Sequence, residues 1–283
     1  MTITQAIVLG LVQGITEFLP ISSSGFLILV PEVFGWNVQS QAFDAFLHVA
    51  TLIAIVAALW VEVKAISKAW FVPSKDKQSV ALRRLAVWIV LATVTVLIFG
   101  VLFQAVFEIE FRSVQIVAWS FIVWGTVLYV VDRRVPRETI VSDPPSPRLR
   151  RASRTELFQT TTVGLKRAIL IGLSQVIAII PGTSRSGITM TAGLASGLTR
   201  ETAARFSFLL SIPTIAAAGF FKLGSVARGE ESIELLPLAV GFFVAMISAF
   251  LTVRFLLKFL KRYTFSELAI FRVLVGFAIL LLL

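Results

Sequence analysis

The stretch Gln13-Gly-Ile-Thr-Glu17-Phe-Leu-Pro20-Ile-Ser22-Ser23-Ser24-Gly25 interrupts an otherwise apolar segment that covers residues 4–30. Gln13 and Glu17 are four residues apart, so they share one face of a helix. Pro20 then ends that helix, and three consecutive serines follow it. A carboxylate and a run of hydroxyls inside an apolar segment are costly there, so this break in the helix is a candidate functional site.

A second polar break, Pro181-Gly-Thr183-Ser184-Arg185-Ser186-Gly187-Ile-Thr189, interrupts residues 168–199. It repeats the first break at a fixed offset, because Ser22, Ser24 and Gly25 recur 162 residues later as Ser184, Ser186 and Gly187. The same offset relates Ala42, Phe46 and Leu47 to Ala204, Phe208 and Leu209. A match that persists through two consecutive elements predicts an internal repeat.

The composition predicts a membrane protein. Hydrophobic residues make up 57% of the 283 and charged residues 15%, and the mean hydropathy is +0.90, which leaves too little polar surface for a soluble domain. Spans long enough to cross a bilayer are expected at 43–61, 85–107, 114–131, 206–221, 235–253 and 266–283. They must be helical, because lipid cannot form hydrogen bonds with the backbone groups at the open edge of a strand. Residues 1–30 lack a basic start and contain Glu17, which argues against a signal peptide. There is no cysteine, so thiol chemistry is excluded.

The net charge of +10 comes from cations clustered in loops near residues 64–84, 133–167 and 254–262. This pattern predicts that the three loops are cytoplasmic and face lipid headgroups, and nucleic acid is not an expected partner. Two halves with an odd number of spans each must point in opposite directions. We therefore expect an all-α polytopic membrane protein with an inverted-topology repeat, six transmembrane helices and two re-entrant helical hairpins. Its parts are a first repeat (1–132), a cytoplasmic linker (133–167) and a second repeat (168–283).

The two breaks together supply the parts needed for phosphoryl transfer: a carboxylate, hydroxyl nucleophiles and an arginine whose planar fork suits phosphate oxygens. Alternatives remain open for each part. Glu17 could brace a loop, the serines could cap a helix, and Arg185 could form a structural ion pair with Glu17. His48, the one histidine, lies four residues after Asp44 and is a candidate acid or base, or a structural donor. We interpret the charges near span ends as interface charges: Arg112, Arg200, Arg205, Arg272, Glu62, Glu201 and Glu267.

The pair of motifs resembles the two signature motifs of the bacterial undecaprenyl-diphosphate phosphatases linked to bacitracin resistance, and the resemblance covers nearly the whole chain. It implies hydrolysis of undecaprenyl diphosphate to the monophosphate carrier used in peptidoglycan synthesis. It also implies an inner-membrane site open to the outer face, a polyprenyl diphosphate substrate and a divalent cation, Mg²⁺ or Ca²⁺. One departure is Phe26, where many relatives have a histidine.

Carried over by position, the resemblance implies catalytic roles for Glu17, Ser23, Arg185 and Gln13, with Glu17 also on the metal. His48 is a further catalytic candidate, which could substitute for the histidine absent at position 26; otherwise Glu17 alone handles the proton or activity is reduced. The expected phosphate-binding residues are Ser22, Ser24, Thr183, Ser184, Arg185, Ser186 and Thr189. The attacking group is either Ser23 or a water activated by Glu17. Broken helices in an inverted repeat are also a design of secondary transporters, so a lipid-phosphate flippase or anion carrier is the alternative function. The oligomeric state stays open, with a homodimer as one candidate.

Overall fold

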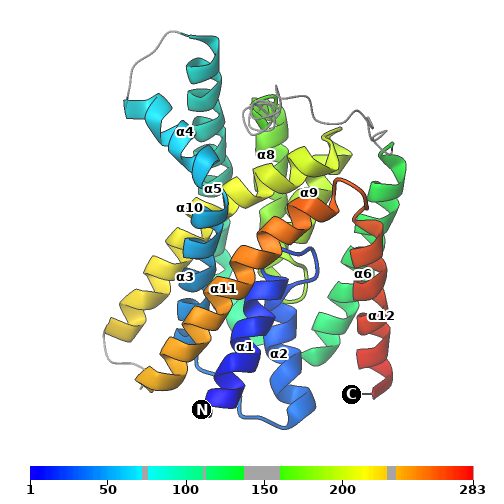
Figure 1. The fold of residues 1–283 in the computed structure, drawn as a ribbon. Coiled ribbons are helices and arrows are strands. Elements are labelled where there is room, and N and C mark those ends of the chain that lie inside the picture. Colours follow the sequence, from blue (N-terminus) through cyan, green and yellow to red (C-terminus); the bar gives the residue numbers. More distant parts are fainter. Residues whose placement is uncertain (72–75, 111–112, 137–159, 228–233, 283) are drawn as a thin grey trace.

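The computed structural model describes residues 1–71, 76–110, 113–136, 160–227 and 234–282 (Figure 1). Every regular element within these ranges is helical, as the composition predicts. The elements are α1 (Ile3–Thr16), α2 (Ser23–Phe34), α3 (Gln41–Ala58), α4 (Trp60–Phe71), α5 (Lys77–Glu110), α6 (Val114–Arg134), α8 (Leu165–Ser174), η2 (Gln175–Ile179), α9 (Arg185–Ala195), α10 (Arg200–Ala227), α11 (Leu235–Phe259) and α12 (Ser266–Leu282).

The predicted spans coincide with long apolar helices. Five of them, in α3, α5, α6, α10 and α11, are long and apolar enough to cross a membrane. The sixth, α12, is an apolar helix of 17 residues. Several boundaries differ from prediction. Helices α5 and α10 begin earlier than the predicted spans, at Lys77 and Arg200. The chain also leaves α3 at Leu59 and immediately begins α4, which therefore holds Lys64 and Lys68 on a helix. The protein is an all-helical, multi-pass membrane protein.

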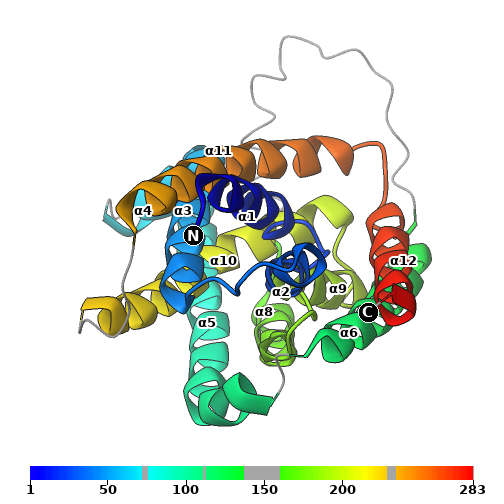
Figure 2. The same cartoon turned by 90° about the horizontal axis from the view of Figure 1, so that it is seen from below.

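Both polar stretches lie at the turns of helical hairpins. In the first hairpin, α1 and α2 are separated by residues 17–22; in the second, η2 and α9 are separated by residues 180–184. Figure 1 shows the two hairpins approaching each other from opposite ends of the molecule, so that their turns meet in its interior. Seen along the other axis, α2 and α9 lie inside a ring formed by the longer helices, and α8 lies between α5 and α6 (Figure 2). Non-helical backbone at this depth is tolerated because protein surrounds it.

Small residues allow the hairpins to pack closely against their neighbours. A side-chain carbon added to Gly14 of α1 would lie 2.6 Å from the Ala245 carbonyl oxygen of α11. One added to Gly172 of α8 would lie 2.7 Å from the Ala92 Cα of α5. Close approach of backbones through small residues is how helices associate in lipid, where burial of apolar surface provides no driving force. The predicted division into repeats of 1–132 and 168–283 stays a prediction, and most of its linker lies outside the described residues.

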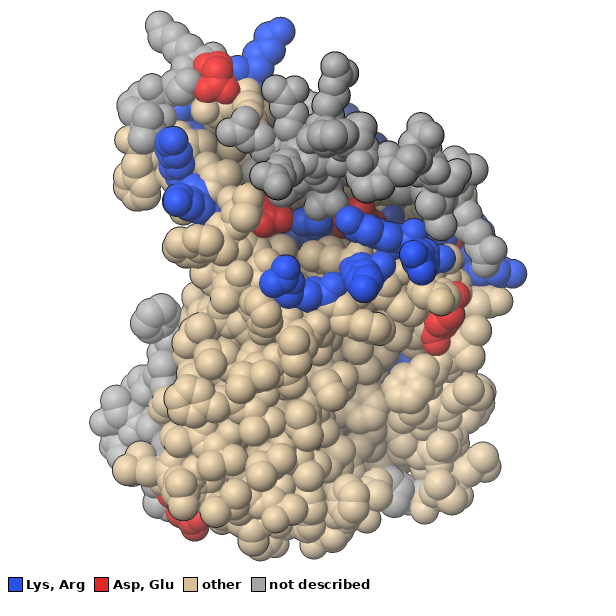
Figure 3. Space-filling model, viewed as in Figure 1, with Lys and Arg blue, Asp and Glu red and all other residues tan. Residues whose placement is uncertain are grey.

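Lysine and arginine gather at one end of the molecule, where α4 and the first turns of α5 and α8 lie (Figure 3). Helices α3, α6 and α11 run toward this basic end, while α5, α10 and α12 run away from it (Figure 1). Three residues that we expected to be interface charges, Arg200, Arg205 and Glu62, are instead buried in ion pairs. Arg200 pairs with Asp132 at 2.7 Å, and Arg205 pairs with Glu62 at 2.6 Å. Our interpretation was wrong for these residues, because each charge finds its partner on another helix of the bundle rather than in water.

Candidate active site

Glu17 is the group on which both breaks converge. Its Oε2 atom accepts hydrogen bonds from Ser23 Oγ at 2.6 Å and from Gln13 Nε2 at 3.1 Å. Its Oε1 atom accepts a hydrogen bond from Arg185 Nη2 at 2.5 Å, across the gap to the second hairpin. The Glu17 side chain is only 6% exposed, and that of Arg185 is 16% exposed. The structure thus brings together four of the residues that the sequence singled out, although 168 positions separate Glu17 from Arg185.

His48 joins this group from α3. Its Nε2 atom lies 3.6 Å from Glu17 Oε2, and its Nδ1 atom lies 2.8 Å from the Asp44 carbonyl oxygen. A carbonyl oxygen only accepts hydrogen bonds, so the Nδ1 atom carries a hydrogen. The other nitrogen, Nε2, faces the Glu17 carboxylate. The two side chains form an ion pair when Nε2 is also protonated. The side chain is 33% exposed, which leaves the imidazole accessible from outside the protein core.

Ser22 and Ser184 hold the turns of the two breaks in the same conformation. Both have a positive φ, +81° and +71°, which is uncommon for residues other than glycine. Each caps the helix that follows: Ser22 Oγ accepts from the Gly25 amide and Ser184 Oγ from the Gly187 amide. Their hydroxyls also contact Ser24 and Ser186 at 3.3 and 3.2 Å. The repeat seen in the sequence is therefore a repeated capping geometry, with Ser23 and Arg185 occupying the same position, directly after the cap.

Other hydroxyls of the second break connect it to its surroundings. Ser186 Oγ donates to the Leu19 carbonyl oxygen at 2.9 Å, which ties the two turns together. Thr189 Oγ1 lies 2.6 Å from Ser207 Oγ on α10. Ser24 is exposed, whereas Thr183 is fully buried. The phosphate-binding roles of these residues stay predictions.

Sequence reasoning missed Arg272 of α12, which it assigned to the membrane interface. Arg272 is 1% exposed, and its Nη2 atom donates to the carbonyl oxygens of Gly182, Thr183 and Ser120. Its guanidinium also lies 5.4 Å from the ring centre of Phe121. Arg272 therefore braces the turn that presents Arg185. No local sequence pattern predicts this role, because the partners of Arg272 are backbone carbonyls of segments distant in the chain.

Phe26, found where many relatives of the resembled family have histidine, packs among other aromatic rings. Its ring centre lies 5.4 Å from that of Phe121 and 6.4 Å from that of Phe271, on α6 and α12 respectively. The imidazole that reaches Glu17 in this protein is that of His48. The histidine beside the Glu17 carboxylate therefore comes from α3 and not from position 26.

The site has capacity left for a ligand. Among the buried atoms of the described residues, Gln13 Oε1, Thr183 Oγ1, Arg185 Nη1 and Arg272 Nε have no hydrogen-bond partner. Two of these, Thr183 Oγ1 and Arg185 Nη1, are donors on the second break and suit an anion, whereas Gln13 Oε1 is an acceptor near the Glu17 carboxylate. The described part of the chain holds no group of three or more acidic, histidine or cysteine side chains placed to bind a metal. A metal ion at this site would therefore complete its ligand shell largely with substrate oxygens and water, as Mg²⁺ commonly does.

This fold and this centre define a class: a multi-pass helical membrane protein in which two broken helices bring a carboxylate, a hydroxyl and a guanidinium together. The family model described as "Bacitracin resistance protein BacA" matches residues 6–278, and the chain belongs to this family.

Similar proteins cover the whole chain. The chain is 40% identical to "Undecaprenyl-diphosphatase 2" of Stutzerimonas stutzeri, over 100% of this chain and 98% of the relative. It is 38% identical to "Undecaprenyl-diphosphatase 1" of Pseudoalteromonas translucida, over 100% of this chain and 99% of the relative. It is also 38% identical to "Undecaprenyl-diphosphatase" of Colwellia psychrerythraea, over 99% and 98%.

Proposed function

We propose that this protein is an undecaprenyl-diphosphatase, which hydrolyses undecaprenyl diphosphate to undecaprenyl phosphate and inorganic phosphate. This reaction regenerates a lipid carrier for peptidoglycan synthesis and confers bacitracin resistance. The observation that carries the proposal is the Glu17 carboxylate, which accepts hydrogen bonds from Ser23 and Arg185 at the meeting point of the two breaks. Family membership and the names of its full-length relatives support the same activity.

Ser23 is the proposed nucleophile. Its hydroxyl already donates to Glu17 Oε2, so the carboxylate can take the proton as the serine oxygen attacks the terminal phosphorus. The bond between that phosphorus and the bridging oxygen breaks, undecaprenyl phosphate leaves, and water then hydrolyses the phosphoserine. A water molecule activated by Glu17 is the alternative nucleophile. In either case Glu17 acts as the general base, and Gln13, hydrogen-bonded to it, orients the carboxylate.

Arg185 is the proposed clamp for the terminal phosphate. One of its nitrogens is occupied by Glu17, whereas Nη1 is buried and has no partner among the described residues. Substrate oxygens would complete its hydrogen bonds and neutralise the charge that spreads over the transferring phosphoryl group. Thr183 Oγ1 and the amides at the start of α9 are further candidate donors.

His48 is proposed to transfer a proton other than the one that Glu17 takes from the nucleophile. Its Nδ1 hydrogen is held by the Asp44 carbonyl, so only Nε2 can exchange a proton with Glu17 or with the substrate. With a proton on Nε2, the imidazolium would stabilise the negative charge of Glu17 before the reaction. During the reaction it would donate that proton to the oxygen of the leaving undecaprenyl phosphate.

We also propose a divalent cation, Mg²⁺ or Ca²⁺, at this centre. Glu17 and the unpartnered Gln13 Oε1 are the protein oxygens that would hold it. The bound ion would supply charge neutralisation to the diphosphate oxygens. Arg185 and His48 would keep the carboxylate in position beside it.

The proposed location is the bacterial inner membrane, with the site open to its outer side. The clustering of lysine and arginine at one end supports a cytoplasmic placement of that end. Both described chain ends, Met1 and Leu282, then lie on the outer side, because they sit at the opposite end of the molecule (Figure 1).

The test is phosphate release from a polyprenyl diphosphate by purified protein in detergent, with and without a chelator. Wild-type protein is expected to release phosphate, and Arg185→Ala and Ser23→Ala are each expected to reduce the rate at least about 100-fold. Lys258→Gln, an exposed change at the basic end, is the matched control and should keep the wild-type rate. No release by folded wild-type protein would overturn the proposal in favour of a flippase or anion carrier, whose transport should survive Ser23→Ala.

A further inference from the structure

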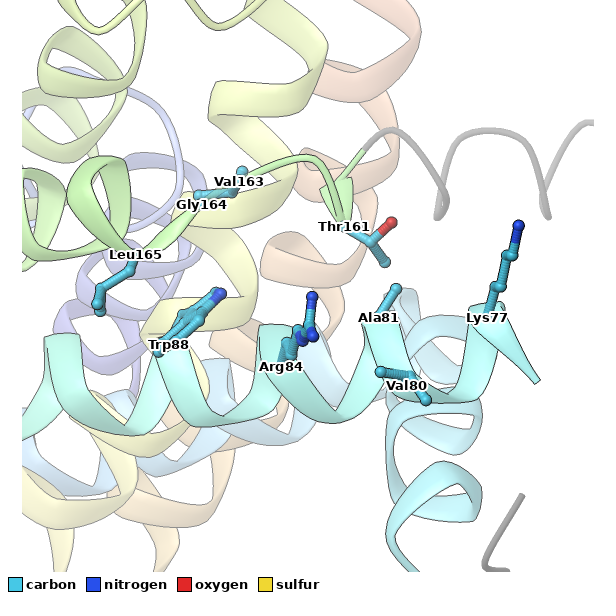
Figure 4. A pocket seen from close by; sticks show the side chains of 9 residues that line it. All are labelled: Lys77, Val80, Ala81, Arg84, Trp88, Thr161, Val163, Gly164 and Leu165. Atoms are coloured by element: carbon cyan, nitrogen blue, oxygen red, sulfur yellow. The ribbon is translucent and has the colours of Figure 1, made fainter. Parts of the chain in front are cut away.

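A cavity lies at the basic end of the molecule, between α5 and the start of α8. Its volume is about 490 Å³, and its lining comprises Lys77, Val80, Ala81, Arg84, Trp88, Thr161, Val163, Gly164 and Leu165. Figure 4 shows the α5 side chains facing the segment that leads into α8. Nothing in the proposed hydrolysis uses this cavity.

Among the described residues, the charged side chains that line this cavity are cations. Lys77, Arg84 and Trp88 recur at intervals of seven and four residues, so they follow one face of α5. No hydrogen bond or ion pair joins Lys77 or Arg84 to another residue of the described chain, and none of the described residues that line the cavity is acidic. Thr161 adds a hydroxyl on the opposite wall. This lining suits an anion with several oxygen atoms.

The cavity continues into a surface suited to hydrocarbon. Leu165, at its edge, is 40% exposed, and the same face of α8 continues with Ile169 at 40% and Leu173 at 46%. The spacing of four residues places these three side chains in one column on α8. Trp88 lies at the boundary between the charged and apolar parts, as tryptophan commonly does at the edge of a membrane. A ligand with a charged head and an apolar chain would therefore fill both parts.

We propose that this cavity binds the phosphate headgroup of an anionic membrane phospholipid, whose acyl chain lies along α8. The cavity belongs to the same end of the molecule as the other exposed cations, the level at which headgroups meet a membrane protein (Figure 3). The same helix, α8, leads into the second break, so the bound lipid would stabilise the hairpin that carries Arg185. The binding itself does not depend on the proposed phosphatase activity.

The test is lipid binding by the delipidated full-length chain in neutral detergent, followed by native mass spectrometry during titration with dioleoylphosphatidylglycerol. Dioleoylphosphatidylcholine and inorganic phosphate serve as comparison ligands. The double variant Lys77→Gln/Arg84→Gln is expected to bind phosphatidylglycerol at least about tenfold more weakly than wild type. The control pair Lys258→Gln/Arg262→Gln removes two exposed cations from the same end of the molecule and is expected to bind as wild type does.

Each other outcome contradicts the proposal. Equal losses in the two double variants would mean that the cations attract anionic lipid without a defined site. Equal binding of phosphatidylcholine would remove the role of the charges, and displacement of the lipid by millimolar phosphate would identify a free-anion site instead. The melting temperature of the lipid-free Lys77→Gln/Arg84→Gln variant reports whether it folds. If that variant is unstable, Arg84→Lys provides the second test, because it keeps the charge and should bind lipid nearly as wild type does.

Discussion

At the scale of single residues, Glu17 combines two roles that the sequence offered as alternatives. It forms an ion pair with Arg185 and, through its other oxygen, accepts the Ser23 hydroxyl proton in a hydrogen bond. A buried carboxylate with these partners is held in one orientation, which a general base requires. The ion pair that joins the hairpins is therefore also part of the proposed catalytic centre.

Glu17→Gln removes both roles, and two different measurements report their loss. The amide oxygen can still accept a hydrogen bond from Ser23, but it cannot take the proton, and Arg185 loses its counter-charge. Phosphate release is expected to fall at least about 100-fold, and the free energy of unfolding is expected to fall by about 3–5 kcal/mol because a buried charge is left unpaired. Chemical denaturation in detergent and phosphate assays measure the two effects, and full activity would exclude Glu17 as the base.

His48→Gln tests the proton transfer assigned to the imidazole. Glutamine keeps a donor of similar length but cannot exchange a proton, so the turnover number is expected to fall about 100-fold, with little change in KM. The companion variant Asp44→Asn leaves the carbonyl that holds Nδ1 in place and should lose much less turnover. Similar turnover in His48→Gln and wild type would make His48 a structural donor.

At the scale of helices, close contacts through glycine position the hairpins. The α1 helix packs on α11 at Gly14, and α8 packs on α5 at Gly172. Each contact fixes the depth of a polar turn within the bundle, since sliding the hairpin would bring larger neighbouring side chains into the interface. The distance between Glu17 and Arg185 therefore depends on packing that involves neither residue.

Gly14→Ala is expected to destabilise the protein by about 1–3 kcal/mol, the usual cost of overpacking. The added carbon would lie 1.9 Å from Ser248 Oγ and 2.6 Å from the Ala245 carbonyl oxygen, so α1 and α11 must separate. Gly164→Ala is the matched control, because a carbon added there meets no atom within 4 Å. Denaturation midpoints of the two variants in the same detergent make the comparison, and equal midpoints would contradict the packing argument.

At the scale of the whole molecule, buried ion pairs join the helices at the basic end. Asp132 at the end of α6 accepts hydrogen bonds from Arg200 of α10 and from the backbone and hydroxyl of Ser266 at the start of α12. Arg205 of α10 reaches Glu62 of α4 in the same part of the bundle. These contacts hold the ends of α6 and α10, and both helices pack against α9 of the second hairpin.

Asp132→Ala should reduce the free energy of unfolding by about 3–5 kcal/mol, because the buried Arg200 guanidinium loses its counter-charge. The activity per folded molecule should change little, since Asp132 contacts none of the residues at the site. The double variant Asp132→Ala/Arg200→Leu should recover part of the lost stability, because it removes the unpaired charge. A double variant whose loss equals the sum of the single losses would show that the pair does not interact.

The sequence alone predicted the class of fold and identified the two candidate functional segments. Span lengths follow from the thickness of hydrocarbon, and the polar breaks are visible because a carboxylate, an arginine and hydroxyl runs are costly at that depth. The motifs Gln13–Gly25 and Pro181–Thr189 were sufficient for the resemblance that the family match confirms. These are properties of short stretches of chain, which can be recognised before folding is considered.

Only the tertiary structure decided which of these groups meet. It brought His48 of α3 to Glu17, enclosed Phe26 between aromatic rings and directed Arg272 onto the backbone of the second break. It also showed that Arg200 and Arg205, which we expected to be interface charges, are buried partners of Asp132 and Glu62. Such contacts depend on how helices distant in the chain rotate and slide against one another, and that geometry arises from packing of the whole bundle rather than from any local pattern.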